Sequence, residues 1–509
     1  MFGKKKQNDH IPSDDDKGLD INGTFSPIKQ EFIDEIKKIT HSPADLIIKE
    51  VTESIVIAFI ENLVDKRILE EHLITVVEHT EPITPTELQR ILPIPRLKLT
   101  EQKKEIIYDM LAGTVIIYID GYCEVGLANI ASIQNRSLSA PENESQVIGS
   151  QVGFNESLGT NVSLVRSFIR NPNLCIEEFS VGKQTNTVFS MIYVNSIASE
   201  QNIRIVRERI NNLNINDLID SAMLAELIED NSYSIFPQML LTERPDRFCD
   251  GLLNGKIGII VNGSSMAILC PTSFLEFFHS REEQNLRWQL ATFIRLLRFN
   301  AVFLSIYLTP LYVASLTFHY EIIPQPLLVP LSESRAIVPF PPIIEALILE
   351  LIIELLREAG ARLPTKVGQT IGIVGGIVIG TAAVQAGITS NILIIIIALC
   401  ALASFTTPNY MMGNVIRLLR FPIIFLAGFW GYYGIMLSLC LLIIHLLRQS
   451  SLGAPYLSPL YPPRILDWGT AIIRLPIGLL KTRATSNGTF NREVMQEKDK
   501  PQRDDVMKE

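Results

Sequence analysis

Cysteine, histidine and catalytic motifs are sparse in this sequence, and their absence excludes several classes of protein. The six cysteines among 509 residues form no CxxC pair and no zinc-ligand spacing, so we expect neither a zinc ribbon nor a disulfide framework but six free thiols. The seven histidines lack metal-ligand spacing, and no Walker glycine loop or GxSxG segment occurs. We therefore expect no catalytic residue, no metal and no cofactor, and hence no enzyme.

Two further absences concern partners and location. A net charge of -9 without a basic stripe argues against nucleic acid as a partner. The first residues, MFGKKKQNDHIPSDDDKG, contain basic side chains but no apolar segment, so they predict no secretory signal. The polar half of the chain is therefore expected to stay in the cytoplasm.

Charge is also missing from one long stretch. Residues 299–445 contain 6 acidic and 6 basic residues, against 54 and 45 in the whole sequence. The preceding part has the mixed composition of a soluble protein, whereas this stretch is apolar with glycine and proline. The contrast divides the chain into a soluble region and a membrane region.

The soluble region alternates helical and strand-like segments. FSPIKQEFIDEIKKI has apolar residues at helical spacing, TVIIYIDG suits a buried strand, and GKIGIIVNGSSMAILCP predicts two strands joined by an Asn-Gly turn. The loop GFNESLGTN is interpreted as structural, with a ligand-binding loop as the alternative. The fold class predicted here is α/β, as two small subdomains. The predicted ranges are 1–25 disordered, 26–140 first subdomain, 141–152 linker and 153–290 second subdomain.

The membrane region is predicted as an all-α polytopic domain of about 5–6 helical segments. It covers residues 291–450, and a membrane-proximal segment at 451–483 and a disordered tail at 484–509 follow it. The candidate spans are 301–318, 343–356, 367–387, 392–407 and 421–447. The last run suits either a tilted span or a hairpin broken at GFWGYYG. Four spans are the alternative to five or six.

Basic residues predict the orientation, because positively charged segments stay on the cytoplasmic side. The residues that predict cytoplasmic ends are Arg295, Arg298, Arg357, Arg362, Lys366, Arg417, Arg420 and, for the tail, Arg448, Arg464, Arg474, Lys481 and Arg483. Both ends of the run 421–447 are thus basic, which does not suit a single crossing.

Glutamates interrupt one apolar run. Glu350, Glu354 and Glu358 stand four residues apart in PFPPIIEALILELIIELLREAGARLP, and Glu345 precedes them. Ionisable side chains at membrane depth face protein or water, where they mark an ion path or pair with a cation such as Arg357. The alternative is an amphipathic helix at the membrane surface. The four glutamates are our candidates for pore or interface residues.

Glycines form a second regular pattern. Gly368, Gly372, Gly376 and Gly380 stand four apart over three turns, so one helix face has no side chains and a neighbouring helix can approach closely. The interpretations are packing within one subunit, or a subunit interface or pore-facing seam. We hypothesise that this glycine face and the glutamate stripe belong to one ion pathway.

Several segments, found in the same order, resemble the A subunits of the GerA family of bacterial spore germinant receptors. The resemblance covers about residues 30–475. The matching segments are GFNESLGTNVSLVRSFIRNPNL, TERPDRFCDGLLNGKIGIIVNGSSMAILCPTSFLEFF, PFPPIIEALILELIIELLREAGARLP, GQTIGIVGGIVIGTAAVQAG, NVIRLLRFP and HLLRQSSLGAPYLSPLYP.

The resemblance implies a multi-pass protein of the spore inner membrane whose N-terminal domain faces the cytoplasm of the spore core. It implies a transporter-like, nutrient-binding B subunit, a lipoprotein C subunit and membrane lipid as partners. It also implies a homo-oligomer, a pentamer in the family, that forms a nutrient-gated cation channel and starts germination, without enzyme activity. The alternatives are a SpoVA-group spore membrane protein that is not a nutrient receptor, a secondary transporter, for which we see no internal repeat, and a scaffold.

Overall fold

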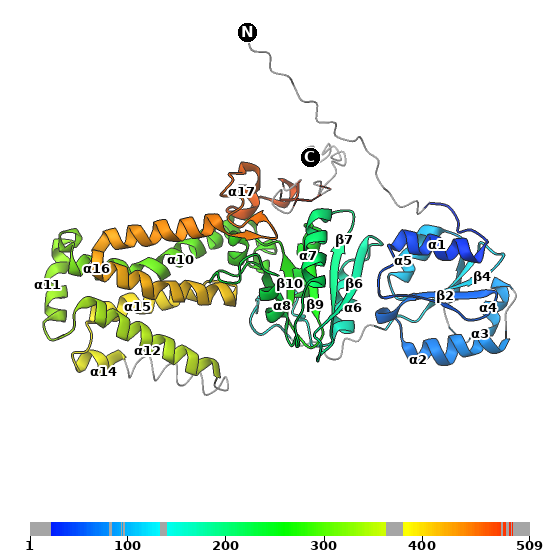
Figure 1. The fold of residues 1–509 in the computed structure, drawn as a ribbon, viewed down its shortest axis with the longest axis horizontal. Helices are drawn as coiled ribbons and strands as arrows, with labels where there is room; N and C mark the ends of the chain where they lie inside the picture. Colours follow the sequence, from blue (N-terminus) through cyan, green and yellow to red (C-terminus); the bar gives the residue numbers. More distant parts are fainter. Residues whose placement is uncertain are drawn as a thin grey trace, which may run out of the picture.

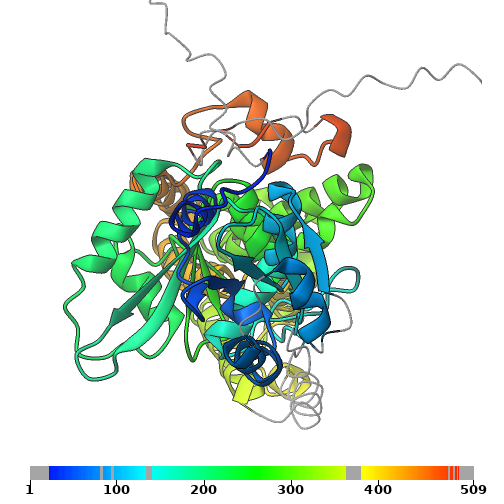
Figure 2. The ribbon, with the colours of Figure 1, turned by 90° about the vertical axis from the view of Figure 1, so that its right-hand side faces the viewer.

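The computed structural model describes residues 22–80, 84–92, 94, 97–132, 140–362, 380–479, 482–484, 488–489 and 491. Three parts follow one another along its long axis: a first sheet unit (22–132), a second sheet unit (140–285) and a helix bundle (288–448) (Figure 1). In Figure 2, which looks along that axis, the three parts overlap.

The first sheet unit is built on a five-stranded antiparallel sheet of order β1-β2-β4-β5-β3. Helices α1 and α5 cover one face, and α2, the π-helix η2, α3 and α4 cover the other. Because both faces are covered, β2 and β4 are buried throughout and their sequences are continuous apolar runs. The strands are β1 Leu46–Glu50, β2 Ile55–Ile60, β3 Leu97–Thr100, β4 Thr114–Ile119 and β5 Val125–Asn129. The helices are α1 Lys29–Thr40, η1 Glu61–Leu63, α2 Lys66–Ile68, η2 Leu69–Ile74, α3 Thr75–Thr80, α4 Pro85–Ile91 and α5 Lys103–Met110.

The second sheet unit has an antiparallel sheet of order β6-β7-β9-β10-β8, with α6 and α9 on one face and α7 and α8 on the other. The predicted hairpin is confirmed: β9 and β10 pair around a turn in which Gly263 has φ 88°, a conformation that glycine adopts without strain. The strands are β6 Leu174–Val181, β7 Thr187–Val194, β8 Leu240–Thr242, β9 Ile257–Val261 and β10 Ala267–Cys270. The helices are α6 Leu158–Phe168, α7 Glu200–Asn211, α8 Ser221–Ile228, α9 Pro245–Leu253, η4 Phe274–Phe278 and η5 Arg281–Gln284.

The two units repeat one topology. Each starts with a helix and a β-hairpin, continues through helices on the opposite face to an edge strand, and ends with a helix and a second hairpin. In this order α1 corresponds to α6, β3 to β8 and α5 to α9. The repeat is not visible in the sequence.

The helix bundle contains three long helices, the shorter α15 and several short segments. Two of these helices, α10 and α16, are the ones in the described residues that are long and apolar enough to cross a membrane. The helices are α10 Trp288–Thr317, η6 Tyr320–Ile322, α11 Gln325–Arg335, α12 Pro342–Arg362, α14 Gly380–Gln385, α15 Asn391–Ser404 and α16 Tyr410–Arg448. Most of the predicted span at 367–387 lies outside the described residues.

Helix α16 folds back on itself within GFWGYYG. Gly431 has φ 59° and ψ -137°, which is not helical and is open to glycine alone among common residues. A Cβ on Gly434 would lie 2.1 Å from the carbonyl oxygen of Leu426, eight residues earlier, whereas eight residues of straight helix span about 12 Å. The run 421–447 is therefore a helical hairpin, and Figure 1 shows its two arms meeting at the left. Because the chain folds back, both basic ends of this run lie at the same end of the bundle, which a single crossing would not allow.

The helices run alternately between the end of the bundle beside the second sheet unit, the sheet-side end, and the opposite, distal end. Helix α10 starts at the sheet-side end and finishes beside Gly431. Helix α12 returns, with Ile343 against Gly428 at the distal end and Arg357 against Ser404 at the sheet-side end. The first arm of α16 runs outward and its second arm returns.

The C-terminal segment packs against the second sheet unit and the sheet-side end of the bundle. Strands β11 and β12 form a small hairpin, and Tyr456, which is fully buried, donates a hydrogen bond from its hydroxyl to the carbonyl of Pro237 at 2.6 Å. The elements are β11 Ser450–Ser451, β12 Ala454–Pro455, α17 Ile465–Ala471 and η8 Ile477–Leu479. One hydrophobic core joins the second sheet unit to α10 and α16, with Phe278 and Ile306 among its members.

Candidate functional site

Helix α12 places the four predicted glutamates at different depths. Pro342 opens the helix, where its missing N–H and fixed φ cost nothing, and the apolar residues between the glutamates favour burial. Glu345 and Glu350 are each 1% exposed, whereas the side chains of Glu354 and Glu358 are 27% and 64% exposed. The stripe is thus not one surface: two members lie inside the subunit and two lie toward its sheet-side end.

Glu350 forms a buried ion pair with Arg420 of α16. The guanidinium Nη1 donates to the carboxylate at 2.6 Å, and both side chains are at most 2% exposed. Arg420 also donates to the carbonyl and hydroxyl of Ser305 on α10, and the hydroxyl of Thr309 donates to Glu350 at 3.1 Å. Because a buried charge is tolerated only when it is paired, this network fixes α12, α10 and the first arm of α16 relative to one another.

Glu345 serves the start of α15. Its carboxylate accepts the backbone N–H of Ser390 at 2.6 Å and the hydroxyl of Thr389 at 3.1 Å. Ser390 is the N-cap of α15, so Glu345 lies at the positive end of that helix dipole. Arg335 of α11 lies 3.9 Å away. Glu345 therefore connects α12 to the turn that precedes α15 at the distal end of the bundle.

The other two glutamates lie nearer to solvent. Glu354 is 3.4 Å from Arg357 and 3.7 Å from Arg417, so the predicted pairing within the helix is present together with one from α16. Glu358 pairs with Arg362 at 2.6 Å on the exposed surface. Whether any of these four carboxylates lines a pore stays a prediction.

The glycine pattern is only partly described. Gly368, Gly372 and Gly376 lie outside the described residues, and a Cβ on Gly380 would meet no atom within 4 Å. A close glycine contact between α12 and α16 is found at a different position, where a Cβ on Gly428 would come within 2.3 Å of Ile343. The close approach of α12 to α16 therefore depends on a glycine that the four-residue spacing did not select.

The loop GFNESLGTN is structural in its contacts. Ser157 is the N-cap of α6 and accepts the N–H of Thr160. The buried Asn161 donates to the carbonyl of Asn155 at 2.6 Å and accepts its N–H at 2.9 Å. These bonds use the polar atoms of the loop to start α6.

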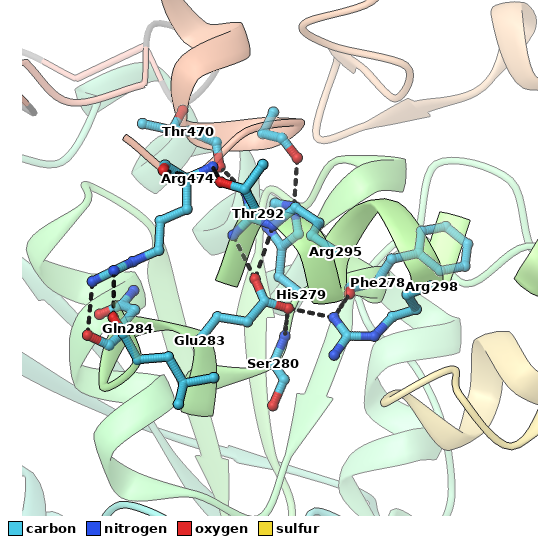
Figure 3. A network of polar contacts seen from close by, with 12 residues as sticks. Phe278, His279, Ser280, Glu283, Gln284, Thr292, Arg295, Arg298, Thr470 and Arg474 are labelled. Atoms are coloured by element: carbon cyan, nitrogen blue, oxygen red, sulfur yellow. Dashed lines mark hydrogen bonds and ion pairs between the residues drawn. The ribbon is translucent and has the colours of Figure 1, made fainter. Parts of the chain in front are cut away.

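A second polar cluster, which the sequence analysis did not select, joins the second sheet unit to α10 (Figure 3). Glu283 of η5 accepts hydrogen bonds from Arg295, at 2.6 and 2.8 Å, from Arg298 and from the backbone N–H of Ser280. Arg298 also donates to the carbonyl of Phe278. We call Glu283, Arg295, Arg298 and Arg474 the junction cluster. The positive-inside pattern selects Arg295 and Arg298 only as markers of the cytoplasmic side. In the structure their side chains point toward Glu283.

The electrostatics of the junction cluster follow from its burial. Burial disfavours the charge of Glu283, but the positive charges of Arg295 and Arg298, with the hydrogen bond from Arg298, outweigh it and hold the pKa of Glu283 below its ordinary value. Burial, with the charge of Arg295 in addition, lowers the pKa of His279 to about 3. His279 is therefore neutral at physiological pH and donates its Nε2–H to the carbonyl of Ala471 at 2.7 Å.

The possible metal ligands and the cysteine thiols are the remaining candidates for chemistry in the described residues. Within the described ranges, no set of three or more His, Cys, Asp or Glu side chains is placed to hold a metal ion. The six cysteines are all described and all free. Burial raises the pKa of Cys249 and Cys270 to about 12, so neither thiol is a ready nucleophile at neutral pH.

The fold defines the class of protein: two sheet units covered by helices are joined to a helix bundle whose outward side chains are large and apolar, as in membrane proteins. These exposed side chains include Phe303, Leu304, Ile395, Leu399, Leu402, Phe425, Phe429 and Met436. A family model described as Bacillus/Clostridium GerA spore germination protein matches residues 34–486. The chain belongs to this family.

Individual proteins are similar to this chain. The chain is 42% identical over 455 residues to spore germination protein GerQA of Bacillus cereus, covering 89% of this chain and 91% of the relative. It is 33% identical over 476 residues to the uncharacterized membrane protein YfkQ of Bacillus subtilis (strain 168), covering 92% of each. A crystal structure of the N-terminal domain of the A subunit of the Bacillus megaterium spore germinant receptor GerK3 matches with 22% identity and a TM-score of 0.38, over 50% of this chain and 98% of that chain.

Proposed function

We propose that this chain is the A subunit of a nutrient germinant receptor in the spore inner membrane, and that it oligomerises, as a pentamer, into a cation channel whose opening starts germination. A transporter-like, nutrient-binding B subunit and a lipoprotein C subunit are its partners in this proposal. The observation that carries it is the family match over residues 34–486, which includes most of the first sheet unit, the whole second sheet unit and the bundle. Catalysis has no part in the proposal.

The arrangement of the bundle supports a multi-pass topology. Helices α10, α12, α15 and the two arms of α16 run alternately between its ends, and the residues 363–387 connect the sheet-side end of α12 to the distal start of α15. We propose six crossings on this basis. Arg298, Arg357, Arg417 and Arg448 all belong to sheet-side ends, so the positive-inside rule supports a location of both sheet units in the cytoplasm of the spore core.

Within the proposed channel, the four glutamates differ in burial. Glu345 and Glu350 are held by partners inside one subunit, so they fix the helices. Glu354 and Glu358 are the exposed members, and copies of them around an oligomer axis would form carboxylate rings at the sheet-side mouth. Such rings attract cations and reject anions. The predicted glycine face at Gly368, Gly372, Gly376 and Gly380 is proposed as the packing surface between neighbouring helices.

The test is ion flux through the purified full-length protein in liposomes. We expect selective potassium efflux, reduced severalfold or made less selective by replacing Glu354 and Glu358 with Gln, without loss of assembly. Glu71→Gln, an exposed carboxylate of the first sheet unit, is the matched control and should conduct like the parent. No flux from a correctly assembled oligomer would overturn the channel, and unchanged selectivity in the double variant would overturn the carboxylate rings.

A second candidate within the family is a spore membrane protein that is not a nutrient receptor. It is kept because one extensive relative is named only as a membrane protein. A strain that lacks the gene separates the two, when germination is measured nutrient by nutrient. Loss of the response to one nutrient class supports the receptor, and a normal response to every nutrient supports the alternative.

A further inference from the structure

The junction cluster contains more positive than negative charge. Glu283 is the one carboxylate for both Arg295 and Arg298, and all three side chains are at most 10% exposed. Arg474, from the C-terminal segment, donates to the carbonyls of Leu286 and Gln284 at 2.7 Å. Among the described residues, no carboxylate lies within ion-pair distance of Arg474. The cluster therefore buries three guanidinium groups with one carboxylate, although buried charges are normally paired.

A cavity of about 450 Å³ adjoins this cluster, between α9, the start of α10 and the C-terminal segment. Its cationic lining is Arg247, Lys256, Arg281, Arg295, Arg474 and Arg483. Three of these pair with carboxylates: Arg281 with Asp250, Lys256 with Glu276 and Arg247 with Glu144. Arg295 and Arg474 belong to the junction cluster, in which three guanidinium groups lie with the one carboxylate of Glu283. Asp467 is the remaining carboxylate of the lining.

Arg474 lies close to the positive charge of Arg295. Burial, and in addition the charge of Arg295, lowers the pKa of the Arg474 guanidinium from its ordinary value, and the charge of Glu283 offsets part of this shift. An anion in the cavity would offset this repulsion, and guanidinium groups bind the oxygens of phosphate in a planar, two-pronged manner. A cavity of this volume also accommodates a small phosphorylated group.

We propose that the junction cavity is a binding site for a phosphate group, with Arg474 and Arg295 as its principal donors. The site lies where α10 leaves the second sheet unit, so two sources supply the same chemistry: the headgroup of an anionic lipid, or a phosphate in solution. Either occupant would join three parts of the chain, because the donors come from α10 and the C-terminal segment and the cavity wall comes from the second sheet unit. The inference is independent of ion conduction.

The experiment uses the full-length protein in nanodiscs, with tryptophan fluorescence as the readout. Trp468 stands between the lining residues Asp467 and Gly469, and Trp288 is the first residue of α10, which supplies the lining residue Arg295. One arm titrates inorganic phosphate against chloride at constant ionic strength in phosphatidylcholine nanodiscs. The other replaces part of the phosphatidylcholine by phosphatidylglycerol. A saturable response to phosphate assigns a soluble source, and a response to phosphatidylglycerol alone assigns a headgroup. A response to neither overturns the proposal.

Substitutions of Arg474 test whether the fluorescence response arises at the junction cavity. Arg474→Gln should weaken binding at least about tenfold, since it removes a charged donor pair, and Arg474→Lys should restore only part of the binding, since an ammonium keeps the charge but not the two-pronged geometry. Arg67→Gln, an exposed arginine of the first sheet unit, should bind like the parent. An equal response in Arg474→Gln and the parent would overturn the site. If Arg474→Gln does not fold, the parent titration and the Arg474→Lys variant decide.

Discussion

The two sheet units have the same topology but different neighbours. The cores of the first unit lie entirely within it, on the two faces of its sheet. One face of the second unit shares its core with α10, both arms of α16 and Tyr456 of the C-terminal segment. The units contact one another through polar groups, chiefly the buried pair in which Arg166 of α6 donates to both oxygens of Asp45 at 2.7 and 2.9 Å.

This difference indicates how the repeat is used. A shared apolar core resists separation, because every part that moves away exposes apolar surface to water. The second unit and the sheet-side end of the bundle should therefore move as one body, with the junction cluster as its polar component. The first unit is attached through a buried ion pair, the backbone hydrogen bond from Ala44 to Ile176 and the contact of His41 with Asn173, and it is the part that can shift relative to that body. Substitutions at each of these contacts test this difference between the two units.

The largest effect is expected for Glu283→Gln. The change leaves Arg295 and Arg298 buried without a carboxylate, which should destabilise the second unit and the bundle together by about 3–5 kcal/mol. All three tryptophans lie in the bundle or the C-terminal segment, so thermal unfolding followed by tryptophan fluorescence reports on this body. Glu282→Gln, the adjacent residue, is the control. A loss confined to the first unit would contradict the account.

A smaller and differently placed effect is expected for Asp45→Asn. It leaves Arg166 unpaired between the two units and should weaken their docking by about 3 kcal/mol, while each sheet stays folded. Hydrogen exchange at Ala44, whose N–H is bonded to the carbonyl of Ile176, should accelerate. The tryptophan transition should not move, and Asp34→Asn on the exposed side of α1 should change neither signal. A shifted tryptophan transition would show that the units are one body.

The pH dependence of the junction is the next effect in size. The pKa of His279 is about 3 in the folded protein, below the ordinary 6.5, so the unfolded state binds the proton more strongly. Its contribution is fully present above pH 6.5 and is lost as pH falls toward 3, about 2 kcal/mol between pH 7 and 5. His279→Gln should reduce this loss in tryptophan-monitored unfolding across that range. Identical pH profiles for parent and variant would mean that His279 is not the group that titrates.

The smallest effect is expected on the surface of α12. Glu358 and Arg362 form an exposed pair, with side chains 64% and 79% exposed, so Arg362→Gln should change stability by less than about 1 kcal/mol. Tryptophan-monitored unfolding at low and high salt checks this. A loss of stability comparable to that of Glu283→Gln would show that the exposure of an ion pair does not determine its contribution to stability.

Local patterns in the sequence predicted much of the fold. The buried strand β4 and the hairpin of β9 and β10 follow from apolar runs and an Asn-Gly turn, which act within a few residues. Pairings between distant residues could not be predicted in this way. Glu350 and Arg420 are 70 residues apart, and one sequence does not show which of several basic residues a carboxylate meets.

The junction cluster and the hairpin of α16 could not be predicted for the same reason. Arg295 and Arg298 fit the positive-inside pattern, and only the packing of η5 against α10 shows that they face Glu283. The glycines of GFWGYYG allowed both a tilted span and a hairpin, because composition does not determine φ; the positive φ of Gly431 distinguishes them. The repeat of the two sheets was hidden because each position needs only an apolar side chain of suitable size.

Hydrogen exchange of the full-length protein in nanodiscs tests the central claim most directly. The claim is that the second unit and the sheet-side end of the bundle form one body, and that the first unit is separate. We predict that β7, β9 and the sheet-side parts of α10 and α16 open with one common free energy, and that β2 and β4 open with another. Common opening of the two sheet units, independent of the bundle, would contradict the account.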